Sequence, residues 1–367
     1  MRVLEDFPSR PSFWIKKRGL NVTEKRQYNG LDLVKFGLAL LVAARHMIQL
    51  FYPIESKWRM VIASWLSNLA VPCFFIMAGF LLFRKIGDGR AKGEGKIISA
   101  YCARIFKMAL IWSLIYLPID LYNWWYGRDR VLEWILVYIR YFFLDHPIMH
   151  LWFLLALIVA CGLVWCMYRA GAKPWLIVAA GGMLFIIGCV GDNWYFNQQL
   201  PESIWKIYSM YFKYFVTMRN GVFYGAFFVA VGLWFAKARA RIPFPAAAAG
   251  FLVSALLMYG EVKRCQNVNM VFTSAPAAFF LIAAALEAPG GQQGGGLLYK
   301  RLREMSQWIY LTHVYFLYIF SWTVKWNPLP LTKKGITVSV FAPMLVCCGC
   351  LVALSERRAF KWLKNMI

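Results

Sequence analysis

The sequence has little charge and very little acid. Only 16% of its 367 residues are charged, with 17 Asp and Glu against 41 Lys and Arg, and there are only four histidines. Soluble domains carry about 25% charged and about 45–50% apolar residues, whereas 60% of this chain is hydrophobic. This composition excludes an ordinary soluble enzyme and predicts a polytopic membrane protein.

Several patterns that would assign the chain to other classes are also missing. We find no solenoid repeat, and the glycine-rich loops do not fit the Walker A pattern. The nine cysteines lie mostly within apolar segments and lack metal-type spacing, so we expect packing residues and no metal site. Residues 1–30 are charged and contain no cleavable apolar core, so no signal peptide is expected.

Long hydrophobic runs dominate the sequence. A helix needs roughly 17 to 25 apolar residues to cross about 30 Å of hydrocarbon, and ten windows fit. The expected spans are 31–52, 60–83, 100–124, 149–169, 174–191, 220–237, 244–260, 268–287, 305–325 and 336–355. A shorter apolar segment with charges, 131–144, is expected to be interfacial or re-entrant. The predicted fold class is an all-α membrane bundle of about ten transmembrane helices.

The positive charge indicates how this bundle is oriented. With both termini cytoplasmic, roughly 26 of the 41 Lys and Arg fall on the inner side, as the positive-inside rule requires. We therefore expect a cytoplasmic tail over 1–30, a membrane domain over 31–355 and a cytoplasmic tail over 356–367. The net charge of +24 has no nucleic-acid reading motif with it, so no nucleic-acid partner is expected.

The first span carries two ionisable residues on one face. Lys35 and His46 are eleven positions apart, which at about 100° per residue returns to within about 20° of the same direction. Charged groups inside a span are costly and mark functional sites. His46 is predicted to act as a general base or a transient acyl carrier, and Lys35 to meet a phosphate-bearing donor. The alternatives are a buried structural histidine, and a snorkelling lysine paired with Asp32.

Other polar residues fall at matching depths. Arg104 and Lys107 share a face at the inner end of the third span, where they are expected to form an anion site with Lys35. Asn68 lies at the depth of His46 and is predicted either to orient the imidazole or to hold helices together.

Two further histidines stand in apolar segments. His150 opens the fourth span, two residues before Trp152, and His313 lies in mid-membrane. Each alone is more often structural. Together with His46 they are predicted to outline one polar cavity, with His150 and Trp152 in contact with the substrate.

Taken in order, these segments resemble the acyltransferase 3 family of membrane enzymes. The family's Asp-x-x-Arg, followed eleven positions after the arginine by histidine, is similar to 32–35 (DLVK) and His46. Its Val-Pro-x-Phe-Phe run is similar to 71–75, its His-Leu-Trp-Phe-Leu element to 150–154, and its Tyr-Leu-x-His element to 310–313.

Three positions depart from the family pattern. Lys35 and Lys107 each stand where the family has arginine, and Ala78 stands where it has serine before Gly-Phe. Both lysines keep the charge but lose the bidentate fork of arginine, so donor affinity or choice is expected to differ.

The resemblance implies an O-acetyltransferase type of enzyme in the inner membrane of a bacterium. Such an enzyme moves an acyl group, usually acetyl, from cytoplasmic acyl-CoA to a hydroxyl of a cell-surface glycan or lipid-linked sugar. Acyl-CoA would then be a co-substrate, with no permanently bound cofactor. His46 and His313 would be catalytic, the cations at Lys35, Arg104 and Lys107 would bind the donor, and Asn68 would lie on the acceptor side.

Two other functions remain open from the sequence. A transporter or flippase would use the same cavity to pass a solute or a lipid-linked sugar, although inverted repeats with paired broken helices are not evident. A receptor-like scaffold would leave the intramembrane ionisable residues without a role.

Overall fold

The computed structural model describes residues 28–127, 138–140, 142, 150–193, 198–238, 241–265, 270–289, 296–326 and 332–367. The described residues form helices and contain no strand. The helices are α1 (Asn29–Phe51), η1 (Arg59–Trp65), η2 (Leu66–Leu69), α2 (Ala70–Phe83), α3 (Glu94–Gly127), α5 (Trp152–Arg169), α6 (Pro174–Asp192), α8 (Glu202–Phe212), η3 (Gly221–Gly225), α9 (Ala226–Lys237), α10 (Phe244–Cys265), α11 (Ser274–Glu287), α12 (Leu297–Trp326), α13 (Lys333–Glu356) and η4 (Arg358–Asn365).

Each of the ten segments expected to span the membrane is helical over most of its length. In the described part of the chain, six helices are long and apolar enough to cross a bilayer, and two further apolar helices are shorter, Gly221–Lys237 and Ser274–Glu287. The protein is therefore an all-helical, multi-pass membrane protein, while ten as the number of spans stays a prediction. Nearly all of the tail over 1–30 and most of the interfacial segment over 131–144 lie outside the described residues.

The second span is a continuous helix whose first half is irregular. It begins with a π-helical stretch, η1, passes through a 3₁₀ turn, η2, and becomes regular in α2. Pro72 has no N–H to give to the carbonyl of residue 68, which favours a change of hydrogen bonding here. Ser67 and Asn68 lie within this irregular stretch, next to the polar cavity described below.

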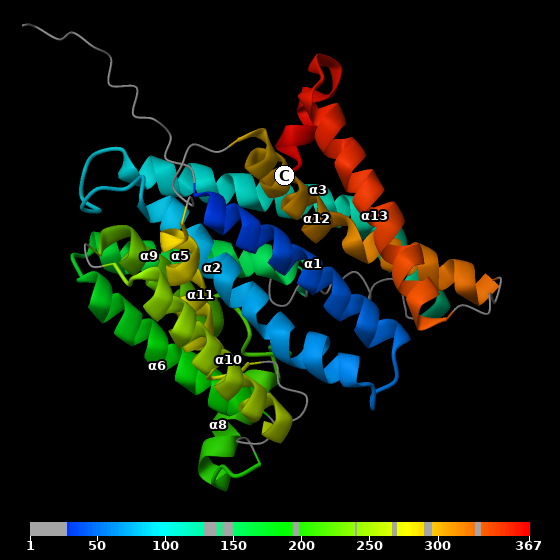
Figure 1. Cartoon of the computed structure of the whole chain (residues 1–367). Helices are drawn as coiled ribbons and strands as arrows, with labels where there is room; N and C mark the ends of the chain where they lie inside the picture. The colour runs from blue at the N-terminus through cyan, green and yellow to red at the C-terminus, as the bar shows by residue number, and fades with distance from the viewer. Residues whose placement is uncertain are drawn as a thin grey trace, which may run out of the picture.

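The helix α1 runs through the middle of the bundle and packs against α12 on one side and α2 and α11 on the other (Figure 1). On the far side of α2 lies α9, and these two helices meet through glycines. A Cβ at Gly79 would stand 2.5 Å from the Val229 oxygen, and one at Gly232 would stand 2.3 Å from the Ile76 oxygen. Small residues allow this approach, as is usual between membrane helices.

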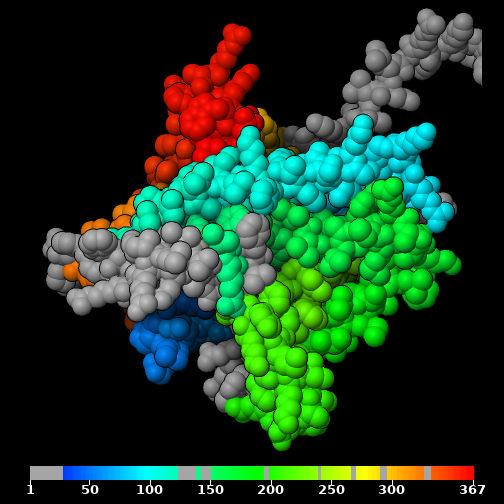
Figure 2. All heavy atoms as spheres, turned by 180° about the vertical axis from the view of Figure 1, so that it is seen from behind, coloured from blue at the N-terminus to red at the C-terminus, as the bar shows by residue number. Residues whose placement is uncertain are grey.

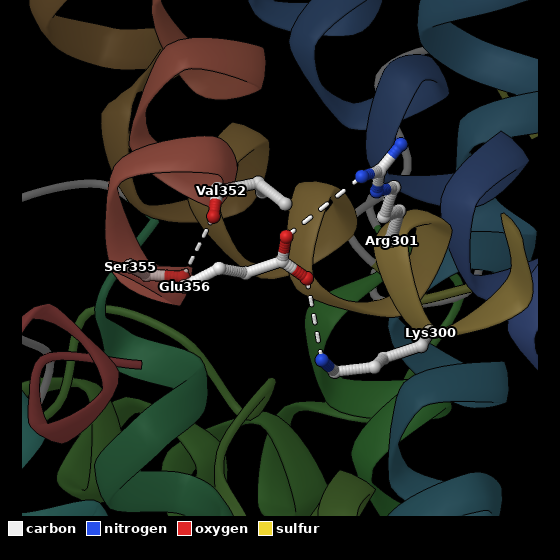
Figure 3. A network of polar contacts seen from close by, with 5 residues as sticks. All are labelled: Lys300, Arg301, Val352, Ser355 and Glu356. Carbon is white, nitrogen blue, oxygen red and sulfur yellow. Dashed lines mark hydrogen bonds and ion pairs between the residues drawn. The ribbon is translucent and has the colours of Figure 1, made fainter. Parts of the chain in front are cut away.

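One end of the bundle is held by ion pairs that α12 makes. Arg303 donates to both carboxylate oxygens of Asp32 at the start of α1, at 2.7 and 2.5 Å. Glu356 at the end of α13 pairs with Lys300 at 3.3 Å and Arg301 at 3.7 Å (Figure 3). The start of α1 and the end of α13 therefore lie at the same end of the bundle. Which membrane face this end occupies stays a prediction from the positive-inside rule.

The outside of the bundle is apolar. Seen from behind, α3 crosses the surface above the green residues of the middle of the chain (Figure 2). Its outward side chains include Leu110, 41% exposed, and Leu114, 69% exposed. Exposed leucines at these fractions along a spanning helix are suited to contact with lipid chains.

Candidate functional site

A small polar cavity of about 50 Å³ lies inside the bundle. Its walls come from α1, the η1–α2 helix, α5, the loop before η3, and α12. The lining residues are Val42, Arg45, His46, Ser67, Asn68, Val71, Phe74, His150, Trp152, Phe153, Arg219, Tyr224 and Tyr310. Four residues predicted for the site from the sequence, His46, Asn68, His150 and Trp152, are therefore gathered around one space.

The three histidines of the apolar segments contact one another: His46 and His150 line the cavity, and His313 lies beside them without lining it. The rings of His46 and His313 stack with centroids 5.3 Å apart, and those of His150 and His313 meet edge to face at 4.9 Å. His313 is 1% exposed and contacts both of the others. The fourth histidine, His146, lies outside the described residues.

The hydrogen bonds of the His313 ring determine which of its nitrogens carries the proton. Its Nδ1 lies 3.0 Å from the Ile309 oxygen and 2.8 Å from the Tyr310 oxygen. Carbonyls only accept hydrogen bonds, so the proton is on Nδ1 and Nε2 is left as an acceptor. Within the described part of the chain, Nε2 of His313 and Nδ1 of His46 are buried and make no hydrogen bond. The pair therefore offers nitrogen atoms for proton transfer.

Tyrosine hydroxyls hold the elements that carry these rings. Tyr310 donates to the His150 backbone oxygen at 2.5 Å, and Tyr116 donates to the Leu311 oxygen at 2.8 Å. Tyr315 donates to the Ile115 oxygen. These bonds join α12 to α3 and to the start of α5, so they fix the relative positions of His150 and His313.

Asn68 does not bond to His46. Its side-chain nitrogen donates to the Ser64 oxygen one turn earlier, at 2.5 Å. The neighbouring Ser67 accepts from Arg45 at 2.9 Å and donates to the Ala63 oxygen at 2.7 Å. Ser67 of the second span thus hydrogen-bonds to α1, while Asn68 contributes to the cavity wall.

Two arginines of the cavity were not predicted as site residues. Arg45 directly precedes His46 in α1, and Arg219 belongs to a loop far along the chain. The Arg219 guanidinium lies 4.8 Å from the centre of the Trp152 ring, a cation–π contact that combines one predicted and one unpredicted residue. Only Lys213 and Arg219 are charged in the loop before η3, so its composition gave no signal for a site.

The cations predicted to bind the donor lie away from the cavity, at the end of α1 that carries Asp32. Lys35 is within electrostatic range of Asp32, Arg303 and Arg104. Asp32 is held by Arg303 and makes no ion pair with Lys35 among the described residues. Lys107 is exposed on α3 and makes no ion pair in the same part of the chain. The structure thus brings Lys35, Arg104 and the unpredicted Arg303 together and leaves Lys107 apart.

A second cavity, of about 220 Å³, opens between Tyr28, α2, α9, the segment before α10, and α11. It contains two arginines, but both are already engaged. Arg241 pairs with Glu287 at 3.6 Å, and Arg84 lies 4.5 Å from the centre of the Tyr28 ring. We therefore do not assign the donor to this cavity. Among the described residues there is also no group of three or more His, Cys, Asp or Glu placed to hold a metal ion.

Three relatives carry the names of racemases. Two are amino-acid racemases of Enterococcus faecalis, 28% identical over 213 residues and 30% identical over 212 residues. The third is a serine/alanine racemase of Enterococcus gallinarum, 24% identical over 294 residues. These alignments cover 58%, 57% and 78% of this chain but only 28%, 29% and 40% of the relatives, so the chain spans less than half of their length.

No solved structure matches the chain. The acyltransferase 3 family model, which is described as an acyltransferase domain, matches residues 28–355. This range includes every residue that lines the cavity and the cations near Lys35. The chain therefore belongs to the acyltransferase 3 family.

Proposed function

We propose that this protein transfers an acyl group, acetyl in the first instance, from acyl-CoA to a hydroxyl of a cell-surface or exported glycan. The observation that carries the proposal is the contact of His46 and His150, which line the cavity, with the buried His313. Family membership supports acyl transfer as the reaction.

The proposed chemistry needs one proton transfer and one exchange of bonds. A nitrogen of His46 takes the proton of the acceptor hydroxyl while the hydroxyl oxygen attacks the thioester carbonyl carbon. The carbon–sulfur bond breaks, and the CoA thiolate leaves and takes up the proton. His313, stacked on His46 and with Nε2 free to accept, is proposed to pass that proton towards the leaving thiolate. In a two-step variant, His46 first carries the acyl group itself.

The two ends of α1 suggest a direction. Lys35 precedes His46 by eleven residues, which is about 16 Å along a helix. We propose that Lys35, Arg104 and Arg303 bind the donor phosphates at the cytoplasmic face of a bacterial inner membrane. Lys107 remains part of the proposed donor set, at its exposed margin. His150, Trp152 and Asn68 are proposed to contact the acceptor.

The test is acyl transfer in membranes supplied with labelled acetyl-CoA. His46→Ala is expected to abolish label transfer to glycan while the protein still inserts into the membrane. The matched control is Leu50→Ala, one turn further along α1, because Leu50 is 56% exposed and outside the cavity. Full transfer by the His46 variant would overturn the assignment.

The remaining candidate, a transporter or flippase, predicts sugar movement into liposomes with no acyl donor present. No contact in the described structure favours it over acyl transfer. Racemisation is the activity that the names of the three relatives state, and we do not extend it to this chain because each alignment leaves more than half of the relative uncovered.

A further inference from the structure

The cavity holds two cations that proton transfer by His46 does not require. Arg45 lies on α1 and Arg219 lies in the loop before η3. Both side chains are half-buried in the cavity wall. Arg45 is held by Ser67, and Arg219 lies against the Trp152 ring. The Arg219 Nε is buried and makes no hydrogen bond within the described residues.

These charges are not neutralised by the cavity wall. None of its lining residues is Asp or Glu, and among the described residues neither arginine forms an ion pair. Asp192 lies within electrostatic range of Arg219 but accepts hydrogen bonds from Met218 and Thr217 and forms no ion pair with it among the described residues. A partly buried cation without a paired carboxylate is unfavourable in a protein interior. Two such arginines lining one small cavity favour the binding of an anion there.

The loop that carries Arg219 is held in a defined shape. The Asp192 carboxylate accepts from the Met218 N–H at 2.9 Å and from the Thr217 hydroxyl. Asn220 caps η3 by accepting from Val222 and Phe223, and its nitrogen donates to the Tyr211 hydroxyl at 2.6 Å. Arg219 stands between these anchored residues, so its backbone is held in place, and its guanidinium lies against the Trp152 ring.

The anion is not the donor's phosphate in the proposed reaction, because that phosphate belongs at the other end of α1. Arg45 is ten residues from Lys35, about 15 Å along the helix, and is adjacent to His46. Resting on the proposed function, we infer that the acceptor carries a carboxylate or phosphate group that Arg45 and Arg219 bind beside the reacting hydroxyl. Guanidinium groups match both anions because they donate two parallel hydrogen bonds.

The test measures binding without acyl transfer, so the two proposals fail separately. Purified protein in detergent is heated with glucuronate, glucose 1-phosphate or glucose, at one ionic strength set with chloride, and the unfolding midpoint is recorded. A ligand that binds only the folded protein raises this midpoint. We expect a rise of a few degrees with at least one of the two anionic sugars and none with glucose. Whether glucuronate or glucose 1-phosphate raises the midpoint shows whether the site binds a carboxylate or a phosphate.

Variants assign the effect to the two arginines. Arg45→Gln and Arg219→Gln are expected to lose the rise, whereas Arg140→Gln is expected to keep it. Arg140 is an exposed arginine outside the cavity that donates to the Tyr214 oxygen, so its removal controls for overall charge. No rise in the unmodified protein, an equal rise with glucose, or a rise that persists in both cavity variants would overturn the inference. Failure of acyl transfer from labelled acetyl-CoA would instead overturn the proposed function.

Discussion

The glycine contact between α2 and α9 makes the sharpest prediction about how the fold supports the cavity. A Cβ at Gly232 would stand 2.3 Å from the Ile76 oxygen, 2.6 Å from the Phe80 nitrogen and 2.9 Å from the Gly79 Cα. All three are backbone atoms, so no side chain can move aside. Ordinary contact begins at 3.4 Å, and Gly232→Ala therefore requires the helices to separate by about 1 Å.

Overpacking of this kind costs about 1–3 kcal/mol. The matched variant is Gly162→Ala on α5, where a Cβ would meet nothing within 4 Å. Both changes replace a helical glycine by alanine, so their gain in helix propensity cancels in the comparison. The difference in stability between the two variants then reports the clash alone.

The clash also reaches the site. Val71 and Phe74 on α2 line the cavity, and Tyr224 in η3, at the start of the helical run through α9, lines it from the opposite element. Separation of α2 and α9 is expected to lower acyl transfer as well as stability. The assay heats the detergent-solubilised variants in steps and follows the monodisperse fraction by size-exclusion chromatography. Equal midpoints and equal activity for Gly232→Ala and Gly162→Ala would refute the reasoning.

Two further predictions concern the donor end of α1. Lys35→Gln is expected to raise the KM for acetyl-CoA more than it lowers kcat. Lys35→Arg is expected to keep or lower that KM, because arginine binds phosphate with two hydrogen bonds. Steady-state kinetics in membranes measure both constants, and an unchanged KM in Lys35→Gln would contradict the prediction. Asp32→Asn is expected to destabilise the protein by about 2 kcal/mol, below the roughly 3–5 kcal/mol of a fully buried pair because the Arg303 side chain is 39% exposed. In a double-mutant cycle with Arg303→Gln, the two losses should not add, and full additivity of the unfolding midpoints would show that the pair does not interact.

The sequence predicted the parts of the site that follow from helix periodicity and family pattern. The spacing of Lys35 and His46 predicts that they share one face of one helix. The motifs around His150 and His313 predict the segment in which each histidine lies and its approximate depth in the membrane. The ring contacts between His46, His150 and His313 then follow from the packing of three helices.

Other partners depend on contacts between distant segments, which spacing cannot give. The Asp32 carboxylate could be expected to pair with Lys35, three residues away, yet it binds Arg303 from a helix 271 positions later. Arg303 presents a planar fork that binds both carboxylate oxygens, which a single lysine ammonium does not. Arg219 reaches the cavity only because Asp192 and Asn220 shape its loop. Lys107 shares a helical face with Arg104 and both are exposed, but Arg104 is the one within electrostatic range of Lys35.

The most direct test of the account is the mass of surface glycans from cells that carry the gene in its normal form or as His46→Ala. The account predicts that glycans from cells with the normal protein are heavier by one acyl unit, and that the His46 variant gives the same mass as cells without the gene. The acyl unit would identify the donor, and the glycan that bears it would identify the acceptor. Identical glycan masses in all three strains would contradict the claim that this protein acylates a surface glycan through His46.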